Sequence, residues 1–169
     1  MQPDAHDDRP LAIVDIDGVI ADVRHRLHHI EGGRKRWGAF FGAAGDDPVH
    51  PEGLAVVATL AADHVVIFLT GRPERLRTVT EAWLELHGIG GRRLLMRSAR
   101  DHRPAAQFKL EEIRRLAASR TIAVVVDDDQ RVLTAVRAAG FTVFAAEWER
   151  RTATGAAALS DAQHDAGLT

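Results

Sequence analysis

Short apolar runs alternate with longer amphipathic segments along this chain. The runs at residues 11–16, 65–69 and 121–126 are typical of strands that are buried on both faces. Two shorter apolar stretches, at residues 94–96 and 141–144, predict two further strands. Five strands are therefore expected, three of them strongly marked.

Helical periodicity fills the segments between these strands, because apolar side chains recur there every three or four residues. The predicted helices cover residues 21–30, 37–41, 52–62, 74–87, 104–119 and 131–139. Strands that alternate with helices indicate βαβ units with right-handed crossovers. The pattern predicts an α/β fold, a doubly wound, Rossmann-like parallel sheet with helices on both faces.

A length of 169 residues suits one domain with a substantial core. Residues 1–10 are expected to form a flexible tail, residues 11–146 the folded domain and residues 147–169 a C-terminal tail. A small helical insert at about residues 21–50 leaves room only for a minimal cap. Such a cap would leave a site open to bulky substrates.

Composition excludes several classes of function. With 22 basic and 24 acidic residues the net charge is −2, which excludes a globally basic nucleic-acid coat but not a local basic patch. The chain has no cysteine, which excludes disulfides, thiolate metal sites and a cysteine nucleophile. No apolar run reaches the roughly 18 residues of a membrane span, and the start is polar and acidic, unlike a secretory signal. No membrane partner and a cytoplasmic location are expected.

Candidate chemistry lies where the predicted strands end, the edge at which parallel α/β sheets bind ligands. The residues at these positions, with one lysine from the helix before the third strong strand, are Asp15, Asp17 and Gly18, then Thr70, Gly71 and Arg72, then Lys109, then Asp127, Asp128 and Asp129. Grouped carboxylates repel one another, and a hard cation such as Mg²⁺ relieves that repulsion. With a hydroxyl and a lysine nearby, such a group suits phosphoryl transfer to a carboxylate.

A purely structural interpretation exists for each acidic pair on its own. Asp15 and Asp17 could form a turn, and residues 127–129 could cap a helix. The order of all four elements, each at a predicted strand end or near one, favours the functional interpretation.

The segment from Asp15 to Asp22, DIDGVIAD, resembles the first motif of haloacid dehalogenase (HAD) superfamily phosphatases. Thr70-Gly71-Arg72, Lys109 and Asp127-Asp128 match the second, third and fourth motifs in order, over residues 11–145. Short sequence segments of the chain also resemble the 3′-phosphatase domain of polynucleotide kinase-phosphatases. These segments contain Thr78, Trp83-Leu84, His87-Gly88-Ile89, Leu95-Met96-Arg97 and Lys109.

The resemblance implies a HAD-type fold and a covalent mechanism. Asp15 would attack phosphorus and form an aspartyl-phosphate, and Asp17 would act first as general acid and then as general base. Thr70 and the amide of Gly71 would hold the phosphoryl oxygens, while Lys109 would balance their charge.

The resemblance also implies a cofactor. Mg²⁺ would be held by the carboxylates of Asp15 and Asp127 and the backbone carbonyl of Asp17, with Asp128 in support. Asp129 departs from the polynucleotide group, which often has a basic or amide residue there, so its role stays open.

Two arginine-rich stretches bear on the substrate. The stretch at residues 24–36 reads either as a solvated face or as a surface that steers a polyanion. Arg72, Arg97 and Arg103 are predicted to bind substrate, the last two from a second stretch at residues 92–103. With the resemblance, they predict removal of 3′-phosphates from DNA or RNA ends. A small-molecule or nucleotide phosphatase is the alternative.

No glycine-rich phosphate-binding loop precedes either lysine, so the kinase half of the bifunctional enzymes is missing from this sequence, and a separate kinase or ligase could be a partner. Two alternatives are not enzymes, a phospho-accepting receiver and an idle binding module. A receiver would place its lysine after its other motifs, whereas Lys109 precedes the second acidic group. One helical face is predicted to carry His25, His28 and His29. This face could hold a zinc site, or it could be solvated or face the substrate.

Overall fold

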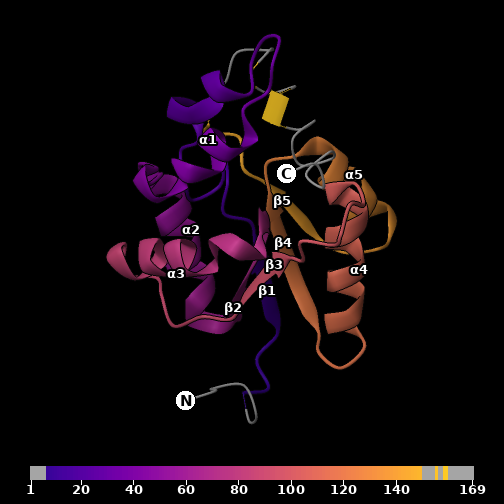
Figure 1. Cartoon of the computed structure of the whole chain (residues 1–169). Helices are drawn as coiled ribbons and strands as arrows, with labels where there is room; N and C mark the ends of the chain where they lie inside the picture. Colours follow the sequence, from indigo (N-terminus) through magenta and orange to yellow (C-terminus); the bar gives the residue numbers. More distant parts are fainter. Residues whose placement is uncertain (1–6, 150–154, 156–157, 160–169) are drawn as a thin grey trace.

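The computed structural model describes residues 7–149, 155 and 158–159. Its five strands form one parallel sheet in the order β3-β2-β1-β4-β5 (Figure 1). The strands are β1 (Leu11–Val14), β2 (Val65–Pro73), β3 (Leu94–Arg97), β4 (Ile122–Asp127) and β5 (Val143–Ala145). Val14, the last residue of β1, pairs with Phe68 of β2 and with Val126 of β4. The residues that follow these three strands therefore meet at one edge.

Helices cover both faces of the sheet, which confirms the doubly wound expectation. In Figure 1, α2 (Pro51–Asp63) and α3 (Arg77–Leu86) lie on one side, and α4 (Ala105–Ala117) and α5 (Gln130–Ala138) on the other. Successive strand residues point to opposite faces. Ala12 and Val14 accordingly belong to the core under α2 and α3, and Leu11 and Ile13 to the core under α4 and α5.

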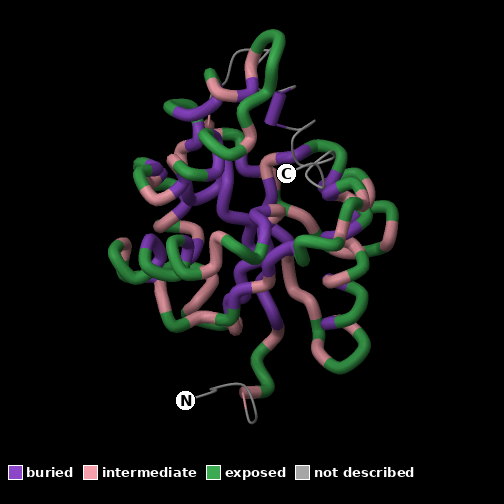
Figure 2. Tube along the Cα trace, viewed as in Figure 1, coloured by how far each residue is buried: buried purple, intermediate pink, exposed green. Residues whose placement is uncertain are grey.

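The segment between β1 and α2 forms the small cap. It contains two short 3₁₀ helices, η2 (Arg24–His29) and η3 (Ala44–Asp46), and the helix α1 (Trp37–Gly42). The helix predicted at residues 21–30 is thus shorter than expected and has 3₁₀ geometry, with Arg26 and Leu27 both turned inward. Its apolar residues pack against Phe40 and Phe41 of α1 in a separate small core, purple in Figure 2.

Strand β2 continues past its predicted end at Leu69 and runs to Pro73. Its pairing with β3 shifts between Leu69 and Pro73, an irregularity that takes residues out of the regular ladder. The residues between them, Thr70, Gly71 and Arg72, stand at the edge where β1 also ends. The helix expected at 74–87 begins as a 3₁₀ turn, η4 (Glu74–Leu76), before α3.

Part of the predicted C-terminal tail is packed onto the domain. Trp148 donates a hydrogen bond from Nε1 to the carbonyl of Val19, at 2.8 Å, and most residues after 149 lie outside the described part of the chain. None of the helices that the structure describes is long and apolar enough to span a membrane.

Gly53 of α2 fixes how closely this helix approaches the loop after β1. A Cβ at Gly53 would lie 2.2 Å from the carbonyl oxygen of Val19 and 2.8 Å from Cα of Ile20, and both are backbone atoms. Gly53→Ala should therefore destabilise the fold by roughly 1–3 kcal/mol, although alanine favours a helix by about 1 kcal/mol over glycine. Urea unfolding measures this change in the free energy of unfolding.

The matched control is Gly38→Ala in α1, where a Cβ would meet no atom within 4 Å. It should leave stability unchanged or raise it. A Gly53→Ala protein at least as stable as the wild type would contradict the close packing.

Candidate active site

The loop after β1 carries the first two acidic residues of the site. Asp15 follows the strand directly, and its backbone N–H donates to the carbonyl of Val126 in β4 at 2.9 Å. Gly18 has φ 78°, a left-handed conformation that favours glycine, and it turns the chain back so that its N–H reaches the carbonyl of Ala21. Asp15 and Asp17 are thereby held in one tight loop, both buried.

Lys109 joins the ends of β1 and β4. Its Nζ lies 2.8 Å from Oδ2 of Asp15 and 2.7 Å from Oδ2 of Asp127, and all three side chains are almost fully buried. Lys109 reaches the edge from the second turn of α4, as predicted for the helix before the third strong strand. Burial disfavours its ammonium, but the carboxylates of Asp127 and Asp15 outweigh this and raise the pKa of Lys109.

The electrostatics of Asp15 differ from those of an ordinary surface carboxyl. Burial raises its pKa well above the usual value; Lys109 opposes this shift, and the carboxylates of Asp127 and Asp128 add to it. Among the described residues, Oδ1 of Asp15 has no hydrogen-bond partner, whereas Oδ2 contacts Nζ of Lys109. Oδ1 can therefore serve as a ligand for a positively charged group.

The same edge fits a divalent cation. Ligand atoms of Asp15, Asp127 and Asp128 all lie within 4.8 Å of one another. They are carboxylate oxygens, the donors that hard cations such as Mg²⁺ prefer. Oδ1 of Asp15, which has no hydrogen-bond partner among the described residues, is the observation that supports the fit.

Asp129 follows directly after the acidic residues at the end of β4. Its backbone N–H donates to Oδ1 of Asp127 at 2.9 Å, and its side chain caps α5 by accepting from the backbone N–H of Arg131 at 2.8 Å. The role of Asp129, which the sequence leaves open, is therefore structural. Asp129 orders the turn that presents Asp127.

Thr70 and Gly71 lie at the end of β2, beside the loop that holds Asp15. Thr70 is completely buried, and its Oγ1 accepts a hydrogen bond from the backbone N–H of Arg72 at 3.2 Å. The threonine hydroxyl keeps its own proton, which it can donate to a phosphoryl oxygen.

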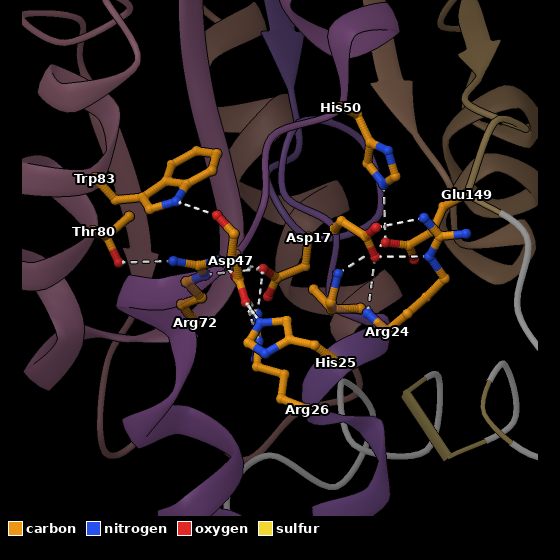
Figure 3. Close-up of polar contacts among 12 residues, drawn as sticks. Asp17, Arg24, His25, Arg26, Asp47, His50, Arg72, Thr80, Trp83 and Glu149 are labelled. Carbon is orange, nitrogen blue, oxygen red and sulfur yellow. Dashed lines mark hydrogen bonds and ion pairs between the residues drawn. The ribbon is translucent and has the colours of Figure 1, made fainter.

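A second group of charges, which we call the buried ion cluster, consists of Asp17, Arg26, Asp47 and Arg72 (Figure 3). Oδ1 of Asp17 accepts from Nη2 of Arg26 at 2.9 Å, and from Nη2 and Nε of Arg72 at 2.6 and 3.0 Å. Burial alone would raise the pKa of Asp17, but the guanidiniums of Arg72 and Arg26 outweigh it and hold that pKa at about 2. Asp17 is therefore a carboxylate in the free protein.

Two members of this cluster were missed by the sequence analysis. Arg26 belongs to the basic stretch that was expected to be solvated or to steer substrate, yet its side chain is fully buried. Asp47 stands in a loop and carries no motif. The only local signal was the spacing of Val23, Leu27 and Ile30, which marks the inward face of the cap without showing that Arg26 joins it.

The arginines predicted to bind substrate have different surroundings. Arg72 is buried behind Asp17 in the ion cluster. Arg97 is buried with its guanidinium 5.2 Å from the ring centre of Phe108, and burial lowers its pKa. Arg103 is about one-third exposed, and pairs with Asp101 at 2.6 Å and with Glu111.

Of these three arginines, Arg103 alone presents its side chain to solvent. It lies in the loop after β3, beside an open hollow of about 590 Å³ that is lined by Ser98, Arg100, Asp101, His102 and Arg103. This loop is the accessible basic surface next to the carboxyl edge of the sheet. Substrate binding by all three arginines stays a prediction.

The three histidines of the cap do not gather into a metal site within the described residues. His25 lies against the buried ion cluster, with Nε2 2.7 Å from Oδ1 of Asp47, whereas His28 and His29 contact each other with ring centres 3.9 Å apart. The 3₁₀ geometry of η2 separates His25 from His29, because residues four apart share a face in an α-helix but not in a helix with three residues per turn.

A further ligand-like group consists of Asp22, His50 and Glu149, the last two of which are labelled in Figure 3. Its atoms are already bonded to protein groups: Oε1 of Glu149 accepts from the backbone N–H of Val23 and contacts Nε2 of His50, while Asp22 pairs with Arg24. The group fastens the segment after β5 to the base of the cap.

The sheet, the minimal cap and the placement of Asp15, Lys109 and Asp127 define a phosphatase of the HAD superfamily. Residues 10–148 match the family model described as the polynucleotide kinase PNKP phosphatase domain, and the chain belongs to that family.

Solved structures share the fold at low sequence identity. A chain of the Pnkp1/Rnl/Hen1 RNA repair complex matches with a TM-score of 0.64 and 23% identity, over 86% of this chain and 45% of that one. The class C acid phosphatase from Bacillus anthracis with tungstate bound matches at 0.58 and 13%, over 93% and 80%. The HAD-like hydrolase SP0104 from Streptococcus pneumoniae matches at 0.56 and 10%, over 89% and 90%.

This chain spans less than half of the RNA repair chain that it matches. No curated protein matches it.

Proposed function

We propose that this phosphatase is a Mg²⁺-dependent phosphomonoesterase that removes 3′-phosphates from nucleic-acid ends through an aspartyl-phosphate intermediate. The observation that carries the proposal is the carboxylate of Asp15. It is buried at the end of β1, its Oδ2 contacts the ammonium of Lys109, and its Oδ1 has no hydrogen bond among the described residues. A carboxylate in this setting can act as a nucleophile toward phosphorus.

In the first step, a carboxylate oxygen of Asp15 forms a bond to phosphorus while the ester P–O bond breaks. The electron pair of that bond goes to the leaving oxygen, which takes a proton from Asp17. Asp17 is ionised in the free protein, since its pKa is about 2. Asp17 therefore has to gain a proton before this step, and a phosphate monoester, which is a monoanion below its second pKa of about 6, can supply one.

In the second step, water attacks the phosphorus of the aspartyl-phosphate. Asp17, again a carboxylate, takes a proton from the water, the bond between Asp15 and phosphorus breaks, and inorganic phosphate leaves. Thr70 and the amide of Gly71 hold the phosphoryl oxygens in both steps. Lys109 balances the negative charge that Asp15 and the phosphoryl group bring together.

Asp15, Asp127 and Asp128 would hold Mg²⁺, with the backbone carbonyl of Asp17. The cation supplies Lewis-acid stabilisation of the charge on the phosphoryl oxygens. It also favours the ionised form of Asp15, whose pKa burial raises.

The nucleic-acid substrate is supported by the family, the small cap and the arginines of the loop after β3. A cap of this size suits a substrate that is a chain end, and Arg103 is a partly exposed arginine that could contact neighbouring phosphates of such a chain. The likeness to a chain of the Pnkp1/Rnl/Hen1 RNA repair complex is consistent with RNA ends as substrates and with a kinase or ligase as a separate partner.

Replacement of the nucleophile tests the covalent mechanism. Asp15→Asn keeps the size of the side chain but removes its attacking charge, so phosphate release should fall by at least about 10³-fold. The assay is release of phosphate from p-nitrophenyl phosphate with Mg²⁺. A variant that keeps more than a tenth of wild-type turnover would exclude Asp15 as the nucleophile.

Removal of the metal tests the cofactor. Excess EDTA should abolish activity, and added Mg²⁺ should raise the thermal unfolding midpoint of the wild type, because a ligand that binds only the folded state stabilises it. Asp127→Asn should lose most of this shift. His50→Gln, in the other ligand-like group, should keep it, and loss of the shift in His50→Gln alone would move the metal to that group.

Comparison of substrates tests the specificity. A 3′-phosphorylated oligonucleotide should exceed a 3′-mononucleotide in kcat/KM by about 10-fold or more, since each added phosphate contact contributes on the order of 1 kcal/mol. The advantage should shrink as salt rises, because these contacts are ionic. Arg103→Ala should reduce it, whereas Arg115→Ala, which removes an exposed arginine paired with Glu112 on α4, should not.

Equal rates for oligonucleotides and mononucleotides at every salt concentration would overturn the nucleic-acid assignment. The protein would then be a nucleotide or small-molecule phosphatase with the same mechanism.

A further inference from the structure

Asp47 holds the centre of the buried ion cluster without being bonded to Asp17. Its carboxylate is completely buried. Oδ1 accepts from Nε of Arg26 at 2.7 Å, and Oδ2 accepts from Nη2 of Arg26 at 2.9 Å and from Nη2 of Arg72 at 2.7 Å. The two arginines that grip Asp17 are therefore both held by Asp47 (Figure 3).

The position of Asp47 is itself fixed from two sides. Nε1 of Trp83, in α3, donates to the backbone carbonyl of Asp47 at 2.8 Å, and Nε2 of His25 lies 2.7 Å from its Oδ1. Asp47 thus connects the cap and α3 to the loop after β1. Two carboxylates and two guanidiniums balance one another in this cluster, so no member can be removed without leaving a buried charge.

The grip on Asp17 is one-sided. All three hydrogen bonds from Arg26 and Arg72 end on Oδ1, and Oδ2 takes no part in them. A guanidinium is a rigid planar fork, so its orientation decides where the carboxylate that it binds can point. Asp47 sets that orientation for both forks at once.

We propose that Asp47 is a positioning residue for proton transfer: through Arg26 and Arg72 it fixes Asp17 so that Oδ2 faces the leaving oxygen of the substrate. This inference rests on the proposed function, in which Asp17 protonates the leaving group. Transfer of a proton requires the two oxygens to lie within hydrogen-bond reach, so a displaced carboxyl loses most of its effect. Asp47 touches neither substrate nor reacting atoms.

A comparison of leaving groups isolates this role. Benzyl phosphate releases an alkoxide, which must be protonated as the P–O bond breaks, whereas p-nitrophenyl phosphate releases a phenolate that leaves as a stable anion. The two esters are similar in size. The ratio kcat/KM covers the steps up to loss of the leaving group, so it reports proton donation and not the later hydrolysis of the intermediate.

Asp47→Asn should lower kcat/KM for benzyl phosphate at least about 10-fold more than for p-nitrophenyl phosphate, since general acid catalysis contributes on the order of 10²-fold or more. Asp46→Asn, at the exposed neighbouring position, should leave both values within about 2-fold of the wild type. Asp47→Glu keeps the charge balance of the cluster but moves the carboxylate, and should show the same selective loss. Circular dichroism reports folding, and Asp47→Glu decides the question if Asp47→Asn does not fold.

An equal loss on the two esters, or no loss on either, would overturn the positioning role of Asp47 while the phosphatase mechanism stands. A wild-type protein that hydrolyses neither ester, or an Asp15→Asn protein that hydrolyses both, would instead overturn the proposed function.

Discussion

The site depends on the balance of charge that the fold buries at the carboxyl edge of its sheet. Four carboxylates, those of Asp15, Asp17, Asp47 and Asp127, are almost fully buried there, with the three cations Arg26, Arg72 and Lys109. These seven groups carry a net charge of −1 when all are ionised, and the half-buried Asp128 adds a further negative charge. Buried charge is tolerated only when it is paired, and a divalent cation beside Asp15 and Asp127 would supply what the protein's own side chains leave out.

The buried charges pair in two separate clusters, and each cluster joins different parts of the fold. Lys109 ties Asp15 to Asp127 across β1 and β4, so it joins the nucleophile to the metal ligand directly. Arg26 and Arg72 tie Asp17 to Asp47, which joins the loop after β1 to the cap. The cap therefore does more than border the site. It contributes Arg26 and Asp47, two of the three charged residues that hold Asp17 in place.

The sequence could predict the first cluster but not the second. Asp15 and Asp127 follow strongly apolar strands, and the rule that parallel strands present their carboxyl ends at one edge was enough to bring them together. Lys109 lies on a helix with a clear period. Arg26 and Asp47 carry no such signal, since their burial depends on how the cap folds onto the sheet. An arginine among histidines in a short amphipathic segment looks the same whether it faces water or a buried carboxylate.

The local geometry of the cap could not be predicted from the sequence either. Residues 21–30 have the apolar spacing of an α-helix, yet the chain there forms the 3₁₀ helix η2, which turns both Arg26 and Leu27 inward. Short segments gain little from helix propensity, so tertiary contacts decide their geometry. Here those contacts are ionic for Arg26 and apolar for Leu27, and they include residues outside the segment 21–30. Asp47 is 21 residues from Arg26.

The two acids of the first loop have opposite electrostatic states although they are two residues apart. Burial raises the pKa of Asp15, whereas the guanidiniums of Arg72 and Arg26 lower that of Asp17 to about 2. On the proposed mechanism, Asp17 has to gain a proton before the first step, and a cation beside Asp15 would favour the ionised form that attacks phosphorus. A monoanionic substrate and a cation would therefore act on the two acids separately. The division of charge between the clusters thus makes reaction depend on both ligands.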